Sequence, residues 1–281
     1  MKTPSVLKFS SKVTLLALIF TFIFIGCNNV NQKKDVKDND SKTEELNEQT
    51  QKVVKLGDQE YPLPTAFELT KLLNNAGASY IFDISNKVEN ADKYFTEKEK
   101  ALNLGVYGAD LSYASTYMKK QETMLLIKAS EKLVDGLNIS TAFNKKLIQE
   151  IEKNIDDKDS LIALITKSFY DSYTFLTGSG KDNISVLVMT GSWVEGIHIA
   201  TQVTSFSKDK TKLKEIIAQQ AVTLDELLSI MEQHNSDKKI AEFEAKLKEV
   251  KKILTLEQEP LSDEQLNALS EKIEKIRDSI I

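Results

Sequence analysis

The sequence predicts an all-α protein, arranged as stacked antiparallel αα-hairpins or an irregular helical bundle of roughly nine to ten helices. Three observations predict this class. From residue 61 onwards apolar residues recur at three- and four-residue spacing, and no segment shows the alternation of a half-buried strand. Only one proline, Pro260, follows Pro64, so long stretches contain no helix breaker. The connections between apolar segments are short, which makes neighbouring helices antiparallel.

The N-terminus has the three parts of an export signal. Three lysines fall within the first 12 residues, an apolar segment follows from 13 to 25, and small Gly26 comes next. The apolar segment is shorter than the roughly 20 residues that a membrane-spanning helix needs. We therefore predict a signal peptide over residues 1–26 that is cleaved between Gly26 and Cys27. A signal anchor carrying an incidental cysteine is the alternative.

Cys27 is the only cysteine in the chain, so an internal disulfide is not available to it. Residues 24–27, Phe-Ile-Gly-Cys, resemble the lipobox of bacterial lipoproteins, although Phe24 stands where leucine is usual. The resemblance implies a lipidated Cys27 with acyl chains such as palmitate. Loss of residues 1–26 moves the formal net charge from −5 to −8, so lipid rather than a basic patch would hold the chain at the membrane.

The residues after the cysteine predict a tether. Residues 27–60 are mostly Asn, Gln, Lys, Asp and Glu, and they contain too little apolar surface to fold alone. Such a segment predicts a flexible leash that holds the domain off the membrane. Asn28 is not the aspartate that resembles an inner-membrane retention signal in some Gram-negative bacteria. We therefore expect the outer membrane, with the periplasmic or surface face left open.

Residues 61–281 are predicted to form one helical domain. The sequence Tyr-Pro-Leu-Pro at 61–64 ends the tether, and Leu69, Leu72 and Leu73 then lie on one helical face. Glycines at 77 and 136 and capping residues at 140, 183, 209 and 262 mark further boundaries. The predicted helices cover residues 65–76, 89–103, 104–119, 121–137, 141–155, 159–177, 183–206, 209–233, 237–255 and 261–280.

The helical segment 102–118 combines small and polar residues. Gly105, Gly108 or Ala109, Ser112 and Ser115 or Thr116 form a face that a neighbouring helix could approach closely. Asp110, Tyr113 and Tyr117 fall on an adjacent stripe, where a carboxylate can accept a hydrogen bond from a phenol. The pattern indicates either a tight crossing with mutually satisfied polar groups or a ligand pocket.

Segment 183–206 is apolar on nearly every face and predicts the buried central helix. Glu195 and His198 near its middle share one face and argue for a protein interior rather than a bilayer. A buried polar pair is one interpretation, and a general acid–base pair is another. A di-metal site would need a second Glu-x-x-His, but the only other histidine, His234, lies at a helix end. We therefore predict no metal and no cofactor.

A third polar stretch lies at 167–176. If the helices at 104–119, 159–177 and 183–206 pack together, their acids and His198 would meet in one polar pocket with nearby aromatic residues. The candidate pocket comprises Asp110, Tyr113, Tyr117, Tyr170, Asp171, Trp193, Glu195 and His198.

The composition narrows the classes of function that are open to the protein. Of 37 basic residues only Arg277 is arginine, and the net charge is negative, which together disfavour nucleic-acid recognition. Two hypotheses remain. One is a lipid-anchored binding or interaction module in the envelope, for which an envelope protein is a candidate partner. The other is an envelope hydrolase or metal-dependent enzyme that uses Glu195 and His198 with nearby acids. No nucleophile has a recognisable setting, so the first is favoured and the catalytic residues stay unassigned.

Three stretches of the chain, 61–86, 90–117 and 191–202, resemble a family of lipoproteins from Bacteroidota. The resemblance covers most of the region from Tyr61 to Gln202. It implies a helical domain on a lipid anchor in a Gram-negative envelope. The family has no assigned biochemical activity, so the resemblance supplies no catalytic residues.

Overall fold

The structure is a computed structural model that describes residues 53–56, 59–62, 66–139, 145–255 and 260–281. The chain divides into two units, Met1–Glu48 and Gln49–Ile281, and every described residue belongs to the second. The predicted signal peptide, Cys27 and the predicted tether up to residue 52 therefore lie outside the described residues.

The described part of the chain is all-α, with ten α-helices, as the sequence predicts. A 3-10 helix, η1, covers Val88–Lys93, and a short antiparallel hairpin pairs strand β1, Val53–Leu56, with β2, Gln59–Pro62. The α-helices are α1 Ala66–Asn75, α2 Glu97–Thr116, α3 Lys120–Gly136, α4 Lys145–Lys153, α5 Lys158–Gly178, α6 Asp182–Phe206, α7 Thr211–Ala218, α8 Gln220–Gln233, α9 Lys238–Lys251 and α10 Asp263–Arg277.

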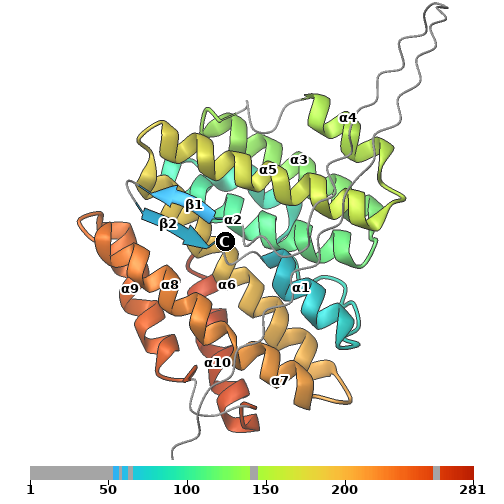
Figure 1. Ribbon diagram of the computed structural model, residues 1–281, viewed down its shortest axis with the longest axis vertical. Helices are drawn as coiled ribbons and strands as arrows, with labels where there is room; N and C mark the ends of the chain where they lie inside the picture. The colour runs from blue at the N-terminus through green and yellow to red at the C-terminus, as the bar shows by residue number, and fades with distance from the viewer. Residues whose placement is uncertain (1–52, 57–58, 63–65, 140–144, 256–259) are drawn as a thin grey trace, which may run out of the picture. The chain divides into compact units, whose positions relative to one another are not determined.

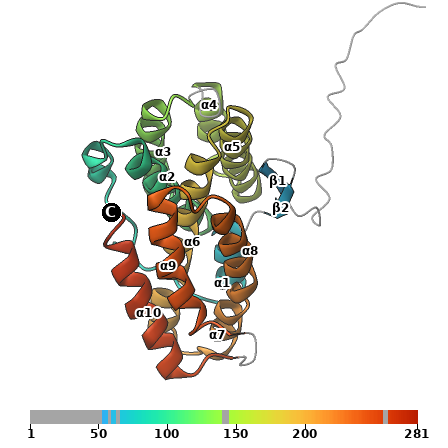
Figure 2. The ribbon, with the colours of Figure 1, turned by 90° about the vertical axis from the view of Figure 1, so that its left-hand side faces the viewer.

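Helix α6 is the central helix, as predicted. It contacts α1, α2 and α5, which precede it in the sequence, and α7, α8, α9 and α10, which follow it. It runs through the middle of both ribbon views (Figures 1 and 2). Among the described residues, α6 is long and apolar enough to cross a membrane, but 94% of its 18-residue apolar stretch is buried inside the protein. Its apolar character is therefore explained by its packing against other helices.

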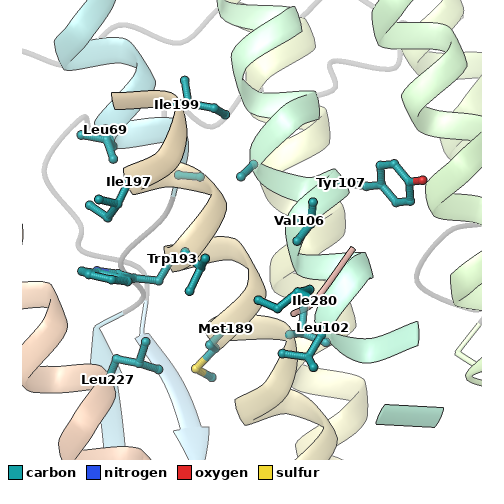
Figure 3. Packing of buried hydrophobic residues seen from close by; sticks show 14 of the residues in the cluster. Leu69, Leu102, Val106, Tyr107, Met189, Trp193, Ile197, Ile199, Leu227 and Ile280 are labelled. Carbon is teal, nitrogen blue, oxygen red and sulfur yellow. The ribbon is translucent and has the colours of Figure 1, made fainter. Parts of the chain in front are cut away.

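Helices α2 and α6 cross with their backbones in close contact. A β-carbon added to Gly105 would lie 2.0 Å from the Val188 carbonyl oxygen, and one added to Gly191 would lie 1.9 Å from that of Leu102. Figure 3 shows Leu102 and Val106 of α2 beside α6, with Tyr107 directed to the opposite side. The predicted close approach at Gly105 is thus confirmed, and only a residue without a side chain fits at either crossing position.

Two predicted helices, 89–103 and 104–119, have different boundaries in the structure. The chain forms η1 and then one continuous helix, α2, that starts after Thr96. Thr96 and Glu99 form a reciprocal capping box, which fixes this start. Asn103, at the predicted break, donates hydrogen bonds to the main-chain oxygens of Glu99 and Ile280, so the helix continues through it.

Two further differences are local. The predicted helix 209–233 is divided into α7 and α8 at Gln219, whose φ of −61° and ψ of −18° are close to a 3-10 turn. The hairpin includes residues 53–56 and 59–60, so the prediction that the tether extends to residue 60 is wrong for these residues. Its signal in the sequence is Val-Val followed after two residues by Gly-Asp, a pattern that favours a hairpin.

Candidate functional site

The polar stripe of α2 holds the segment between α1 and α2, residues 76–96, against the helices; we call it the irregular segment, and η1 is its only regular turn among the described residues. Four main-chain groups of this segment are bound by side chains of α2 or of the residue that follows it. The Asn86 amide donates to Asp110 Oδ2 at 2.9 Å, and the Ile81 amide donates to the Tyr113 hydroxyl at 2.7 Å. The Tyr107 hydroxyl donates to the Lys87 oxygen at 2.8 Å, and the Tyr117 hydroxyl donates to the Ala78 oxygen at 2.7 Å. These contacts satisfy backbone groups of the segment, and the Lys87 oxygen also accepts a hydrogen bond from the Asn90 amide at the start of η1.

Glu195 of α6 forms a buried ion pair with Arg277 of α10. The Arg277 Nε donates to Glu195 Oε2 at 2.6 Å, and its Nη2 donates to Oε1 at 2.9 Å, so the guanidinium grips both carboxylate oxygens. Nη2 also donates to the Ile84 carbonyl oxygen at 3.2 Å. The Glu195 side chain is 0% exposed. The pair therefore joins the central helix, the last helix and the irregular segment at one point.

Asp110 is a buried carboxyl group next to this pair. Burial raises the pKa of Asp110 well above its usual value, and the negative charge of Glu195 raises it further, whereas Arg277 lowers it. Its second oxygen, Oδ1, is buried without an aligned hydrogen-bond partner. Two carboxyl groups beside one guanidinium are most stable when one of them is protonated. The two-pronged contact with Arg277 identifies Glu195 as the charged carboxylate, whereas the raised pKa of Asp110 favours its neutral form.

His198 lies one helical turn after Glu195 and is 5% exposed. Its Nδ1 is 3.1 Å from Glu274 Oε2 but lacks the alignment of a hydrogen bond. Burial lowers the pKa of His198 and outweighs the carboxylates of Glu195 and Glu274, which raise it. The ring is therefore neutral near pH 7, and its contact with Glu274 is not a charged pair.

The structure places Asp110, Glu195 and His198 in one buried group, as the pocket hypothesis requires, but not the aromatic members. Tyr113 and Tyr117 belong to a separate ring cluster with Tyr80, with centroids 4.6 and 5.5 Å from that of Tyr80. The expected hydrogen bonds between Asp110 and the α2 tyrosines are replaced by the bonds to the irregular segment.

The remaining pocket candidates lie elsewhere. Asp171 is half exposed on α5, where it accepts a hydrogen bond from Lys167 at 2.6 Å. Tyr170 packs half-buried against the core. Trp193 is buried on α6, but its indole N–H donates to the Thr223 hydroxyl of α8 at 3.0 Å. Tyr170 and Trp193 therefore contribute to helix packing, and Asp171 to the surface of α5. The polar contacts described for Trp193 and Asp171 go to residues outside the buried group.

Sequence reasoning missed two members of the buried group. Arg277 was visible as the only arginine among 37 basic residues, a signal for a position where the two-pronged guanidinium cannot be replaced by lysine. Asn86 gave no such signal. It is buried, its amide binds Asp110, and its side chain donates to the Tyr94 hydroxyl at 2.9 Å.

Within the described ranges, no group of three or more His, Cys, Asp or Glu side chains is arranged to hold a metal ion. Comparison with known proteins gives no family: no protein-family model, no curated protein and no solved structure matches the chain. The interpretation of the buried group therefore depends on its own geometry.

Proposed function

We propose that the protein is a lipid-anchored binding or interaction module of a Gram-negative envelope, attached through Cys27 to the outer membrane. This proposal rests on the pairing of Glu195 and the burial of His198, the two ionisable groups near the middle of α6. Both oxygens of Glu195 accept hydrogen bonds from Arg277, and the His198 ring is almost completely covered. A substrate would have to displace the buried ion pair to reach Glu195, at a cost of several kcal/mol.

The buried group has a positional role in this proposal. Asp110 and Arg277 each bind the main chain of the segment 76–96, and Tyr113 and Tyr117 bind it at further points. A segment fixed in this way presents a constant surface to a partner without the entropy cost of ordering a loop on binding. The predicted lipidation of Cys27, the predicted tether and the family resemblance support the envelope location of that surface.

Recovery of the anchored protein from its native envelope tests the binding function. After chemical crosslinking, we expect the same partner to be recovered from wild type and from His198→Gln, because the imidazole is not part of the exposed surface. If His198→Gln abolishes partner recovery while the chain remains folded, the assignment of His198 to the interior fails and a direct role of that group has to be considered.

A further inference from the structure

The irregular segment carries an exposed apolar surface at its tip. We define the aromatic patch as Tyr80, Phe82, Lys119, Glu122 and Leu125. Phe82 is 68% exposed, and Leu125 of α3 is also exposed. A cavity of about 390 Å³ opens beside them and is lined by Phe82, Lys119, Lys120, Gln121, Glu122 and Leu125. This volume accommodates one large side chain with its neighbours, rather than a folded domain.

The aromatic patch is held in place by its own contacts. The Tyr80 ring stacks on Tyr113 with centroids 4.6 Å apart, and the Phe82 ring meets the Tyr80 ring edge-on at 5.1 Å. The Tyr80 hydroxyl donates to Glu122 Oε2. Asp83, next to Phe82, has a φ of 63°, in the left-handed region that non-glycine residues rarely adopt. An exposed phenylalanine is thus fixed on a rigid base instead of turning inward.

The aromatic patch contains one cation, Lys119, and one carboxylate, Glu122. Lys119 Nζ lies 4.7 Å from the centroid of Tyr80 and 4.9 Å from that of Phe82, above both rings. Among the described residues no carboxylate forms an ion pair with Lys119, and the nearby Glu122 is engaged by Tyr80. In a chain with a net charge of −5, this lysine offers a cation beside an apolar cavity.

We propose that the aromatic patch is a docking site for a partner protein segment in which a carboxylate lies next to an aromatic or large aliphatic side chain. The apolar side chain enters the cavity against Phe82 and Leu125, and the carboxylate pairs with Lys119. This inference rests on the proposed function and specifies its binding surface. Preorganisation by the buried polar group then reduces the ordering cost of binding.

Ligand-observed NMR on the full chain tests the site with matched dipeptides. We expect saturable binding of acetyl-Asp-Phe-amide in the millimolar range. Replacement by acetyl-Asn-Phe-amide or acetyl-Asp-Ala-amide should weaken binding about fivefold or more, because each lacks one of the two recognised groups. Added salt should weaken the Asp peptide more than the Asn peptide.

Three variants complete the test. Phe82→Ser and Lys119→Gln should each weaken binding of acetyl-Asp-Phe-amide about fivefold or more. Phe206→Ser, which removes another phenylalanine that is 75% exposed, should leave binding unchanged. The site assignment is wrong if no saturable binding occurs at 20 mM peptide (about 2 kcal/mol of affinity), if the Asp and Asn peptides bind equally, or if Phe206→Ser has the same effect as Phe82→Ser. Any of these results leaves the anchoring and partner-recovery tests of the proposed function unaffected.

Discussion

Replacement of Arg277 by methionine is the perturbation whose magnitude the structure defines best. Methionine fills much of the same volume, but it leaves the Glu195 carboxylate buried with neither of its two guanidinium donors. The carboxylate then has to take up a proton. With an unfolded pKa of about 4.3, protonation at pH 7 costs about 3.7 kcal/mol, since each pKa unit corresponds to about 1.4 kcal/mol.

Loss of the hydrogen bond to the Ile84 carbonyl adds about 1 kcal/mol. We therefore expect Arg277→Met to lower the free energy of unfolding by about 4–5 kcal/mol at pH 7, and by only about 2 kcal/mol at pH 5, where protonation of Glu195 costs less. Urea unfolding of the full chain at the two pH values measures both quantities.

Two variants control this experiment. Glu195→Gln combined with Arg277→Met removes both charges and should recover at least half of the loss at pH 7. Lys167→Met breaks an ion pair of exposed side chains with Asp171 and should cost less than about 1 kcal/mol. A loss below about 1.5 kcal/mol for Arg277→Met at pH 7, or a loss that does not shrink at pH 5, would refute the assignment of Glu195 as a buried charge neutralised by Arg277.

The remaining predictions concern four other positions. Gly191→Ala should lower the free energy of unfolding by more than about 3 kcal/mol, because the added β-carbon would collide with the Leu102 carbonyl. Gly178→Ala, whose added β-carbon meets open space, should not. Equal shifts in thermal unfolding for the two variants would contradict the close crossing. Asp110 has a raised pKa, so the folded chain binds its proton more tightly and stability falls as pH rises above about 4; Asp110→Asn should remove that decrease in urea unfolding between pH 4 and 6. His198 has a lowered pKa, so stability is lost as pH falls below about 6.5; His198→Gln should flatten this decrease, and an unchanged pH profile would refute a neutral buried imidazole. Cys27→Ser should release the protein from membranes in cell fractionation, and retention would disprove the lipoprotein assignment.

Much of the fold could be predicted because its signals are local. The helical spacing of apolar residues predicted the all-α class. The apolar residues on nearly every face of 183–206 predicted the central helix. The break at 103/104 was wrong because a long-range contact decides it: Asn103 binds the Ile280 carbonyl, 177 positions further along the chain. Spacing within one helix contains no information about such a partner.

The candidate site could be predicted only in part for the same reason. Acids in apolar helices indicated that Asp110 and Glu195 needed partners, but the partners were a single arginine in the last helix and the backbone of an irregular segment. Asp171 has the same kind of sequence context on α5, yet it faces Lys167 near the surface. When a helix is apolar on several faces, its contacts with other helices decide which face is buried. Spacing within the helix does not predict those contacts.

Amide hydrogen exchange of the irregular segment tests the central claim most directly. The claim is that the buried polar group fixes residues 76–96 and the aromatic patch they carry. The amides of Ile81 and Asn86 donate to side chains of α2, so we expect them to exchange slowly although they lie outside helices and strands. In Arg277→Met both amides should lose protection while core amides of α3 keep theirs. Fast exchange at Ile81 and Asn86 in the wild-type chain would contradict the account.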